Sequence, residues 1–344
     1  WVDMKQMKKL TKLNKKQITM RSLPVVILAA IAFISVPSLL PETADGMKRS
    51  VAVVECSEQY EIIAGGKTVA FIGGIKADST LQTVREKADS DTERKAMVCG
   101  CWMNRYSFLP YCNGRILTAD PFDGETDLMP MARRNIRTVI KKTIEETEDS
   151  LETNRRRTVE LDYYLDTHSV KDEGYNTMAA YADENRRRRA SMEKALKILK
   201  DIKDKKGISI RRTRNYTLLY ADDGRKIRRA GCRLMESETQ KLQKGALMLQ
   251  TEGGFMPEAA GSIYRFDVFC LIPEKGDSIT AAGIFGLNAA SLPGKAVQPA
   301  SLFKGRTTSI STHDIPPLLA PEGTPLFNRN GFFIGINHKG GIIR

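Results

Sequence analysis

The chain is poor in the residue types that bind transition metals. Of its 344 residues, only three are histidine and six are cysteine. The closest cysteine pair, Cys99 and Cys101, is separated by a single glycine and does not form a C-x-x-C motif. Zinc sites draw their ligands from such residues at short, regular spacings. We therefore expect no metal site, and we expect no cofactor.

Signatures of nucleic-acid binding are also missing, although the chain is strongly basic. Its formal net charge is +13, and Lys and Arg concentrate in residues 1–21, 155–189 and 211–233. No aromatic-interleaved basic motif, zinc-finger spacing or RNA-binding motif accompanies these runs. Nucleic acid is therefore not the expected partner. An anionic membrane surface, or the cytosolic flank of a membrane anchor, also accounts for the excess charge.

Long apolar runs are absent except for one near the N-terminus. The run Leu23–Leu40 is interrupted only by two prolines and two serines, and it follows a lysine-rich stretch. About 18 helical residues span roughly 27 Å, which is enough for a bilayer core. We expect a basic cytoplasmic tail over residues 1–22 and a membrane anchor over 23–41, with the remainder periplasmic or at the cell surface. A cleaved signal peptide and secretion are the alternative.

Export would allow the cysteines to form disulfides. Cys99, Cys101 and Cys112 lie close enough in the sequence for a local bridge. Unpaired, buried thiols are the alternative.

Short apolar segments bounded by turn residues predict a β-rich fold. An Asp-Gly turn within 222–224 predicts a hairpin between two of these segments. The polar stretch 78–95 is expected to form a surface loop or a short helix. The expected strands are 50–55, 67–75, 97–108, 114–118, 208–220, 225–235, 246–251, 264–272 and 304–310.

The periodicity changes between residues 128 and 206, where apolar residues recur every three or four positions among charged ones. Ile140, Ile144, Leu151 and Leu161 fall on one helical face. Two helices joined within His168–Gly174 are therefore expected as a long antiparallel hairpin. Several positions along the seam between the helices are polar, so a dry coiled coil is not expected.

Two arginine clusters lie on the expected helices. Glu and Asp residues are interspersed with them, which favours solvated helix faces. The functional alternative is an arm that contacts an acidic partner or an anionic lipid surface. The clusters comprise Arg155, Arg156, Arg157, Arg186, Arg187, Arg188 and Arg189.

The C-terminal stretch Leu319–Gly341 predicts two short strands around a turn at Asn328–Gly331. Its residue order resembles the end of trypsin-like (chymotrypsin-fold) serine proteases. In that family a loop G-[DN]-S-G-[GS]-P-L leads into a hairpin F-N-x-x-G-x-x-x-G-I. Here the loop reads Ala-Pro-Glu-Gly-Thr-Pro-Leu over 320–326, so Glu322 stands at the position of the nucleophilic serine.

Two earlier segments resemble the same family in the same order. Residues 117–121 read Leu-Thr-Ala-Asp-Pro where the family has L-T-A-A-H, which puts Pro121 at the position of the catalytic histidine. The segment YRFDVFCLI at 264–272 resembles the strand whose aspartate orients that histidine, and Asp267 matches the aspartate.

The resemblance implies a mainly β fold, namely a two-barrel chymotrypsin/trypsin-like domain with the antiparallel helical hairpin inserted. The first β-barrel would occupy residues 50–127, the hairpin 128–206, and the rest of the domain with the second barrel 207–344. An N-terminal transmembrane or signal helix would precede it. A different β-barrel or sandwich with a helical arm is the alternative.

The resemblance also implies that catalysis is lost. The family mechanism needs a serine, a histidine and an aspartate, and only Asp267 matches. The family's two oxyanion donors would correspond to the amides of Ala320 and Glu322. Thr324 is the nearest substitute nucleophile, and a Thr–His pair is chemically possible.

We therefore expect a membrane-anchored, extracytoplasmic pseudoprotease that binds a peptide or protein partner. The alternative is a serine-protease-like endopeptidase with relocated catalytic residues.

Overall fold

The computed structural model describes residues 40–106, 109, 111–123, 129–221, 226–264, 273–287 and 299–344. They form a mainly β chain with two closed, six-stranded rings of strands and a helical hairpin, as predicted. The chain divides into two compact units. We call Trp1–Glu55, Met97–Pro121 and Tyr216–Arg344 the barrel unit, and Cys56–Ala96 and Phe122–Asn215 the arm unit.

The expected cytoplasmic tail and nearly all of the expected anchor lie outside the described residues. Within the ranges given above, no helix is both long enough and apolar enough to cross a membrane.

The first barrel is a ring of strands that closes where its last strand pairs with its first. The sequence supplies three of its strands before the helical hairpin and three after it. Strands β1, β4 and β6 also carry residues of the arm unit. In ring order the strands are β1 (Val51–Ala64), β4 (Glu93–Trp102), β5 (Arg115–Ala119), β8 (Ala246–Thr251), β7 (Ile227–Leu234) and β6 (Ser209–Ala221).

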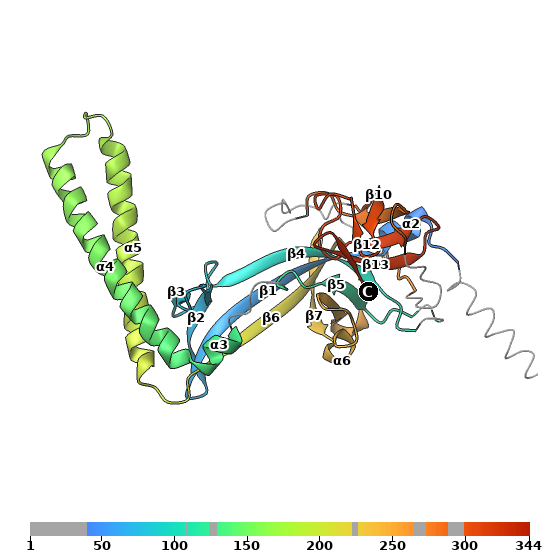
Figure 1. Cartoon of the computed structure of the whole chain (residues 1–344), viewed down its shortest axis with the longest axis horizontal. Helices are drawn as coiled ribbons and strands as arrows, with labels where there is room; N and C mark the ends of the chain where they lie inside the picture. Colours follow the sequence, from blue (N-terminus) through green and yellow to red (C-terminus); the bar gives the residue numbers. More distant parts are fainter. Residues whose placement is uncertain are drawn as a thin grey trace, which may run out of the picture. The chain divides into compact units, whose positions relative to one another are not determined.

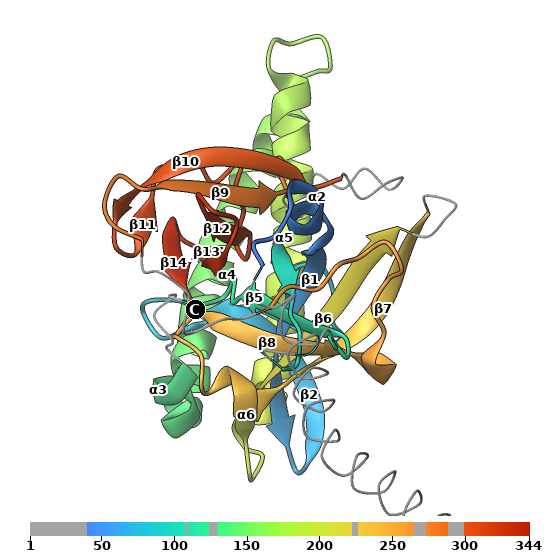
Figure 2. The ribbon, with the colours of Figure 1, turned by 90° about the vertical axis from the view of Figure 1, so that its right-hand side faces the viewer.

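The second barrel, shown in orange and red in Figure 2, is built entirely from the C-terminal part of the chain. Short helices α2 (Ala44–Arg49) and α6 (Glu236–Thr239) and the turn η2 (Glu252–Gly254) complete the barrel unit. The strands in ring order are β10 (Ser301–Ser309), β11 (Thr312–His313), β14 (Gly341–Ile343), β13 (Phe333–His338), β12 (Pro325–Asn328) and β9 (Ser278–Gly283).

The predicted C-terminal hairpin is confirmed as β12 and β13. The side chain of Asn328 accepts hydrogen bonds from the backbone N–H groups of Asn330 and Phe332, at 2.9 and 3.0 Å. Gly331 closes the turn with φ +88°, a conformation that favours glycine. Local side-chain chemistry thus fixes the turn, and it fixes where β13 begins.

The two barrels share apolar contacts inside the barrel unit. All five residues of β5 are buried. Leu117 and Ala119 of β5 lie in one apolar cluster with Phe333 and Ile336 of β13. Because β5 and β13 pack together, the residues that follow β5 and those that precede β12 are brought into one region of the unit.

The arm unit contains β2 (Lys67–Ile75), β3 (Leu81–Arg85) and three helices, α3 (Met129–Arg134), α4 (Ile136–Thr167) and α5 (Tyr175–Lys203). The predicted helical hairpin is confirmed, with the connection at 168–174. Figure 1 shows α4 and α5 side by side along their length. Near its base the hairpin packs Ile140, Leu199 and Ile202 against Ile62 and Ile72 of the strands.

The prediction that 78–95 is a loop or short helix was wrong in part, because it contains β3 and the beginning of β4. Leu81 and Val84 are buried in the core of the arm unit. The N–H of Leu81 donates to the Thr143 hydroxyl of α4 at 3.0 Å. Contacts with a helix distant in sequence, rather than local propensity, therefore place this strand.

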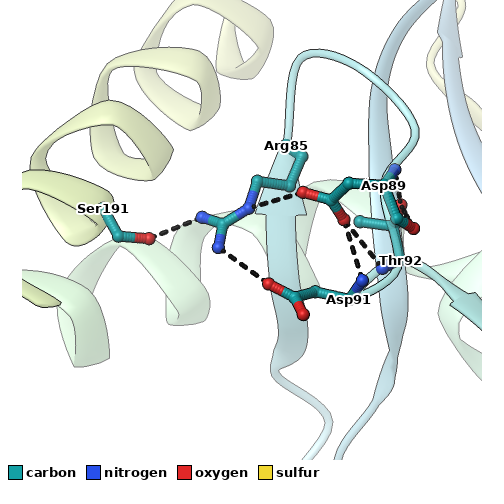
Figure 3. Close-up of polar contacts among 5 residues, drawn as sticks. All are labelled: Arg85, Asp89, Asp91, Thr92 and Ser191. Carbon is teal, nitrogen blue, oxygen red and sulfur yellow. Dashed lines mark hydrogen bonds and ion pairs between the residues drawn. The ribbon is translucent and has the colours of Figure 1, made fainter. Parts of the chain in front are cut away.

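Arg85, at the end of β3, joins the strand to the arm (Figure 3). Its guanidinium lies 3.1 Å from the carboxylate of Asp89 and 3.2 Å from that of Asp91, and it donates to the Ser191 hydroxyl of α5 at 2.5 Å. Thr92 and Asp91 donate backbone N–H groups to Asp89 at 3.0 Å. The Arg85 side chain thus links both the loop that carries Asp89 and Asp91 and helix α5 to strand β3.

A carboxylate with no exposed side-chain surface, Glu58, lies among three arginines of the arm unit. Arg214 contacts it at 2.8 Å, Arg94 at 3.6 Å, and Arg212 also forms an ion pair with it. The Tyr60 hydroxyl donates to Glu58 Oε2, the oxygen that Arg94 also contacts, at 3.0 Å. Burial, followed by the charge of Glu58, raises the pKa of Tyr60 to about 12. The arginines satisfy a charge that could not otherwise be buried.

Candidate functional site

The loop that resembles a protease nucleophile loop packs directly on the first barrel. The carbonyl oxygen of Glu322 accepts the Cys99 N–H of β4 at 2.8 Å. A Cβ on Gly323 would lie 1.9 Å from the carbonyl oxygen of Cys99 and 2.8 Å from the Thr118 hydroxyl of β5. Gly323 also has φ +78°. Only glycine therefore fits this approach.

The carboxylate of Glu322 is held on both oxygens. His338 Nδ1 lies 2.8 Å from one oxygen, and the backbone N–H of Lys339 donates to the other at 2.8 Å. The side chains of Glu322 and His338 are 32% and 10% exposed. Glu322 thus ties the loop to the end of β13.

Asn337, next to His338, forms hydrogen bonds with the same loop through its backbone and its side chain. Its backbone exchanges hydrogen bonds with Gly323 and Thr324, each at 2.8 Å. Its side-chain amide donates to the carbonyl oxygens of Ala320 and Pro321, at 2.6 and 3.3 Å. One buried asparagine therefore determines the backbone path of the loop.

His313 of β11 forms a hydrogen bond with Asn337, and both of its ring nitrogens have hydrogen-bond partners. Its Nδ1 accepts the N–H of Ile315 at 3.2 Å, which assigns the proton of the neutral ring to Nε2. Nε2 then donates to Asn337 Oδ1 at 2.9 Å. Burial lowers the pKa of His313, and the Asn337 contact opposes that shift. In this state His313 is a neutral structural residue rather than an available base.

Thr324, the predicted substitute nucleophile, has no exposed surface. Its hydroxyl has no hydrogen-bond partner of good geometry among the residues described. The Cys99 thiol is beside it; burial raises the pKa of Cys99 to about 11, and the Thr324 hydroxyl and the backbone of Ile284 oppose this shift. A substrate could reach Thr324 only if the loop moved.

The predicted oxyanion donors are arranged in the same loop. The Ala320 N–H donates to the carbonyl oxygen of Pro316 at 3.0 Å. This amide is therefore already used within its own chain segment, and stabilising an oxyanion would require breaking that bond.

The other predicted site residues are only partly covered by the structure. Pro121 is partly buried and follows β5 two residues after Ala119, in the unit that also contains Glu322. Asp267 and most of its expected strand lie outside the described residues. Asn337 was not predicted as a site residue; its signal was the Asn-His-Lys sequence at the end of an otherwise apolar strand.

Among the described residues, the thiols and acidic groups form no metal site. Cys99, Cys101, Cys112 and Cys232 are in the thiol form, and the first three are buried. Burial raises the pKa of each of these three thiols. In the same part of the chain, no group of three or more His, Cys, Asp and Glu residues is placed to hold a metal ion.

The chemistry available is thus a carboxylate–imidazole pair on a tightly bonded loop between two barrels. No family model matches the chain, and neither the curated proteins nor the solved structures gave a match.

Proposed function

We propose that the barrel unit is a degenerate trypsin-like domain that binds a peptide or protein segment without cleaving it. Two six-stranded barrels are compatible with the chymotrypsin fold. The sequence resemblance adds Pro121 at the histidine position and Glu322 at the serine position. Residues 1–41 are proposed to anchor the protein in a membrane, with the barrels on the extracytoplasmic side.

The observation that carries this proposal is the bonding of Glu322. A working nucleophile needs an accessible atom and a base that takes its proton. Here both side-chain oxygens of Glu322 are hydrogen-bonded, and the neighbouring Thr324 is buried. The loop therefore has the bonding expected of a structural turn, which supports binding without cleavage.

Two exposed apolar side chains beside the loop form a candidate contact surface for a partner. Phe285 and Leu318 are 54% and 55% exposed, and neighbouring exposed apolar side chains of this size can form a binding patch. The two segments are joined by a hydrogen bond from the Gly286 N–H to the Leu318 carbonyl oxygen at 2.9 Å. We expect an apolar side chain of the bound segment to pack against this pair.

The test is selection of binding peptides from a displayed random library with the full chain in mild detergent. Phe285→Asp and Leu318→Asp should each reduce retention of the selected peptides at least about tenfold, because each places a charge in the apolar contact. Ile310→Asp is the matched control, since Ile310 is 65% exposed but lies at the β10–β11 turn. Failure to select any peptide, or equal loss in the control, would contradict the proposal.

Hydrolysis is the second candidate, and one contact favours it. Glu322 and His338 have the relationship of an orienting carboxylate and a base, with 2.8 Å between oxygen and Nδ1. A fluorophosphonate probe should then label one hydroxyl of the folded protein, and His338→Ala should abolish the labelling. Absence of labelling, together with intact casein after prolonged incubation, would leave the binding function.

A further inference from the structure

The outer face of α4 carries a stripe of exposed side chains that no other element of the arm unit covers. Arg156, Val159, Tyr163 and Asp166 follow one another at intervals of three, four and three residues, which places them on one face of the helix. Val159 is 70% exposed and Tyr163 is 72% exposed. This face is opposite the seam with α5, where Leu151, Asn154 and Leu161 are buried.

The order of residue types in this stripe is complementary to itself when it is reversed. Read towards the C-terminus it is basic, apolar, apolar, acidic. Against an antiparallel copy centred near residue 161, Arg156 would face the acidic Asp166, and Val159 would face Tyr163. A two-fold axis then makes each contact twice, as in other isologous interfaces.

We propose that α4 is a homodimerisation surface, in which the stripe packs against the same stripe of a second copy in antiparallel orientation. The two apolar pairs supply the buried area, and the two ion pairs at the ends set the direction and the register.

The charges at the ends of the stripe are available for such a contact. Asp166 is exposed and has no ion pair among the described residues. Arg156 contacts Glu152 of the same helix at 3.2 Å, with side chains 77% and 55% exposed. An exposed intrahelical pair of this kind contributes little, so exchanging it for Asp166 of a second copy costs little.

Charge distribution favours a second copy over an extended anionic partner. The arginine clusters are followed towards the tip of the arm by Glu160, Asp162, Asp166, Asp172 and Glu173. An anionic membrane or a nucleic acid lying along the arm would meet these carboxylates. A second copy in the antiparallel register given above instead places Asp166 against Arg156, and Asp162 already forms an ion pair with Arg186 of the same chain.

The dimer should be weak and sensitive to salt. One helix packed on one helix buries less than the roughly 1,200 Å² typical of a stable complex. Its ion pairs are exposed and are screened as ionic strength rises. Dimerisation is therefore expected at high protein concentration and low salt.

Sedimentation equilibrium of the full chain in mild detergent tests the proposal through charge reversal. R156D places Asp opposite Asp at both ends, and D166R places Arg opposite Arg. Each single variant should raise Kd at least about tenfold. The double variant R156D/D166R should restore dimerisation, because each ion pair again joins an aspartate to an arginine with the two positions exchanged.

Mixing the two single variants gives the most specific test. In a mixed dimer each of the two end pairs again joins Asp to Arg, so R156D and D166R should associate with each other more tightly than either does with itself. R157D is the control, because Arg157 is exposed, has no ion pair within the described residues and lies off the stripe. Circular dichroism confirms that each variant keeps its helices.

A monomeric wild-type chain at the highest attainable concentration and low salt would overturn the proposal. So would a dimer that R156D and D166R leave unchanged, or one that mixing does not restore. If the variants instead altered binding to anionic vesicles or duplex DNA without altering mass, the surface would have a different partner and the proposal would be wrong.

Discussion

Asn154 of α4 and Asn185 of α5 are hydrogen-bonded to each other inside the arm, with 2.6 Å between Asn154 Nδ2 and Asn185 Oδ1. Both are buried. Asn185 Nδ2 also donates to the Thr158 hydroxyl at 2.9 Å. The buried leucines of α4 on either side of Asn154, Leu151 and Leu161, could pack in more than one register, so the pair selects one of them.

We predict opposite effects for single and double substitutions of this pair. Asn185→Leu leaves Asn154 buried without its main partner and should lower the free energy of unfolding by about 1–3 kcal/mol. Replacing both residues by leucine should be neutral or stabilising, by up to about 3 kcal/mol, while relaxing the register. Urea denaturation followed by helical circular dichroism measures both, and a double variant less stable than the single one would contradict the prediction.

Glu58 should contribute strongly to the stability of the arm unit. Glu58→Gln removes the charge that Arg94, Arg212 and Arg214 surround and should cost about 3 kcal/mol, reduced from a fully buried pair because the arginines are partly exposed. The control is Glu55→Gln, whose partner Arg229 is 58% exposed, with a loss below about 1 kcal/mol. Equal effects of the two substitutions would show that burial of Glu58 is energetically unimportant.

His313 should make stability depend on pH. Its pKa is lowered in the folded state, so between that value and the unfolded value near 6.5 the unfolded chain binds more protons. The contribution of His313 is therefore complete above about pH 6.5 and is lost as the pH falls below it. His313→Gln, whose amide can still donate to Asn337, should flatten this part of the profile. Chemical denaturation from about pH 5 to about pH 7.5 compares the slopes, and identical slopes would refute the prediction.

Gly323 should tolerate no side chain. Gly323→Ala combines a left-handed backbone with a clash against the Cys99 carbonyl, so we expect a loss above about 2 kcal/mol. Gly276 separates the two causes, because it has φ +90° but no atom within 4 Å of an added Cβ. Gly276→Ala should cost only about 1 kcal/mol. If both losses were the same, backbone strain alone would explain them, and the close approach to Cys99 would have no measurable effect.

Elements with strong local signals were predictable from the sequence. The apolar spacing through Ile140, Ile144 and Leu151 was sufficient to predict the helical hairpin. The Asn328–Gly331 turn was sufficient to predict the hairpin of β12 and β13. Strand β3 was not predictable, because Leu81 and Val84 are surrounded by polar residues and become buried only against the helices. Periodicity reports local order and cannot report a partner some sixty residues away.

The position of the candidate site in the sequence could be predicted, but its hydrogen bonds could not. Residue order alone pointed to the loop around Glu322. The roles of Asn337 and His313 depend on hydrogen bonds between segments separated by 16 to 24 positions, which no motif encodes. The contact between His338 and Glu322 likewise follows from strand register.

The order of strands in the first barrel has a consequence for the way the protein is made. β1, β4 and β5 precede the helical hairpin in the chain, and β6, β7 and β8 follow it. At roughly 5–20 residues per second, a ribosome needs about 7–26 s to pass from the end of β5 to the end of β8. The hairpin, whose contacts are local, can form within that interval, whereas the edges of β1 and β5 that pair with β6 and β8 stay open. A nascent chain of this design should therefore depend on chaperones that shield strand edges until β8 emerges.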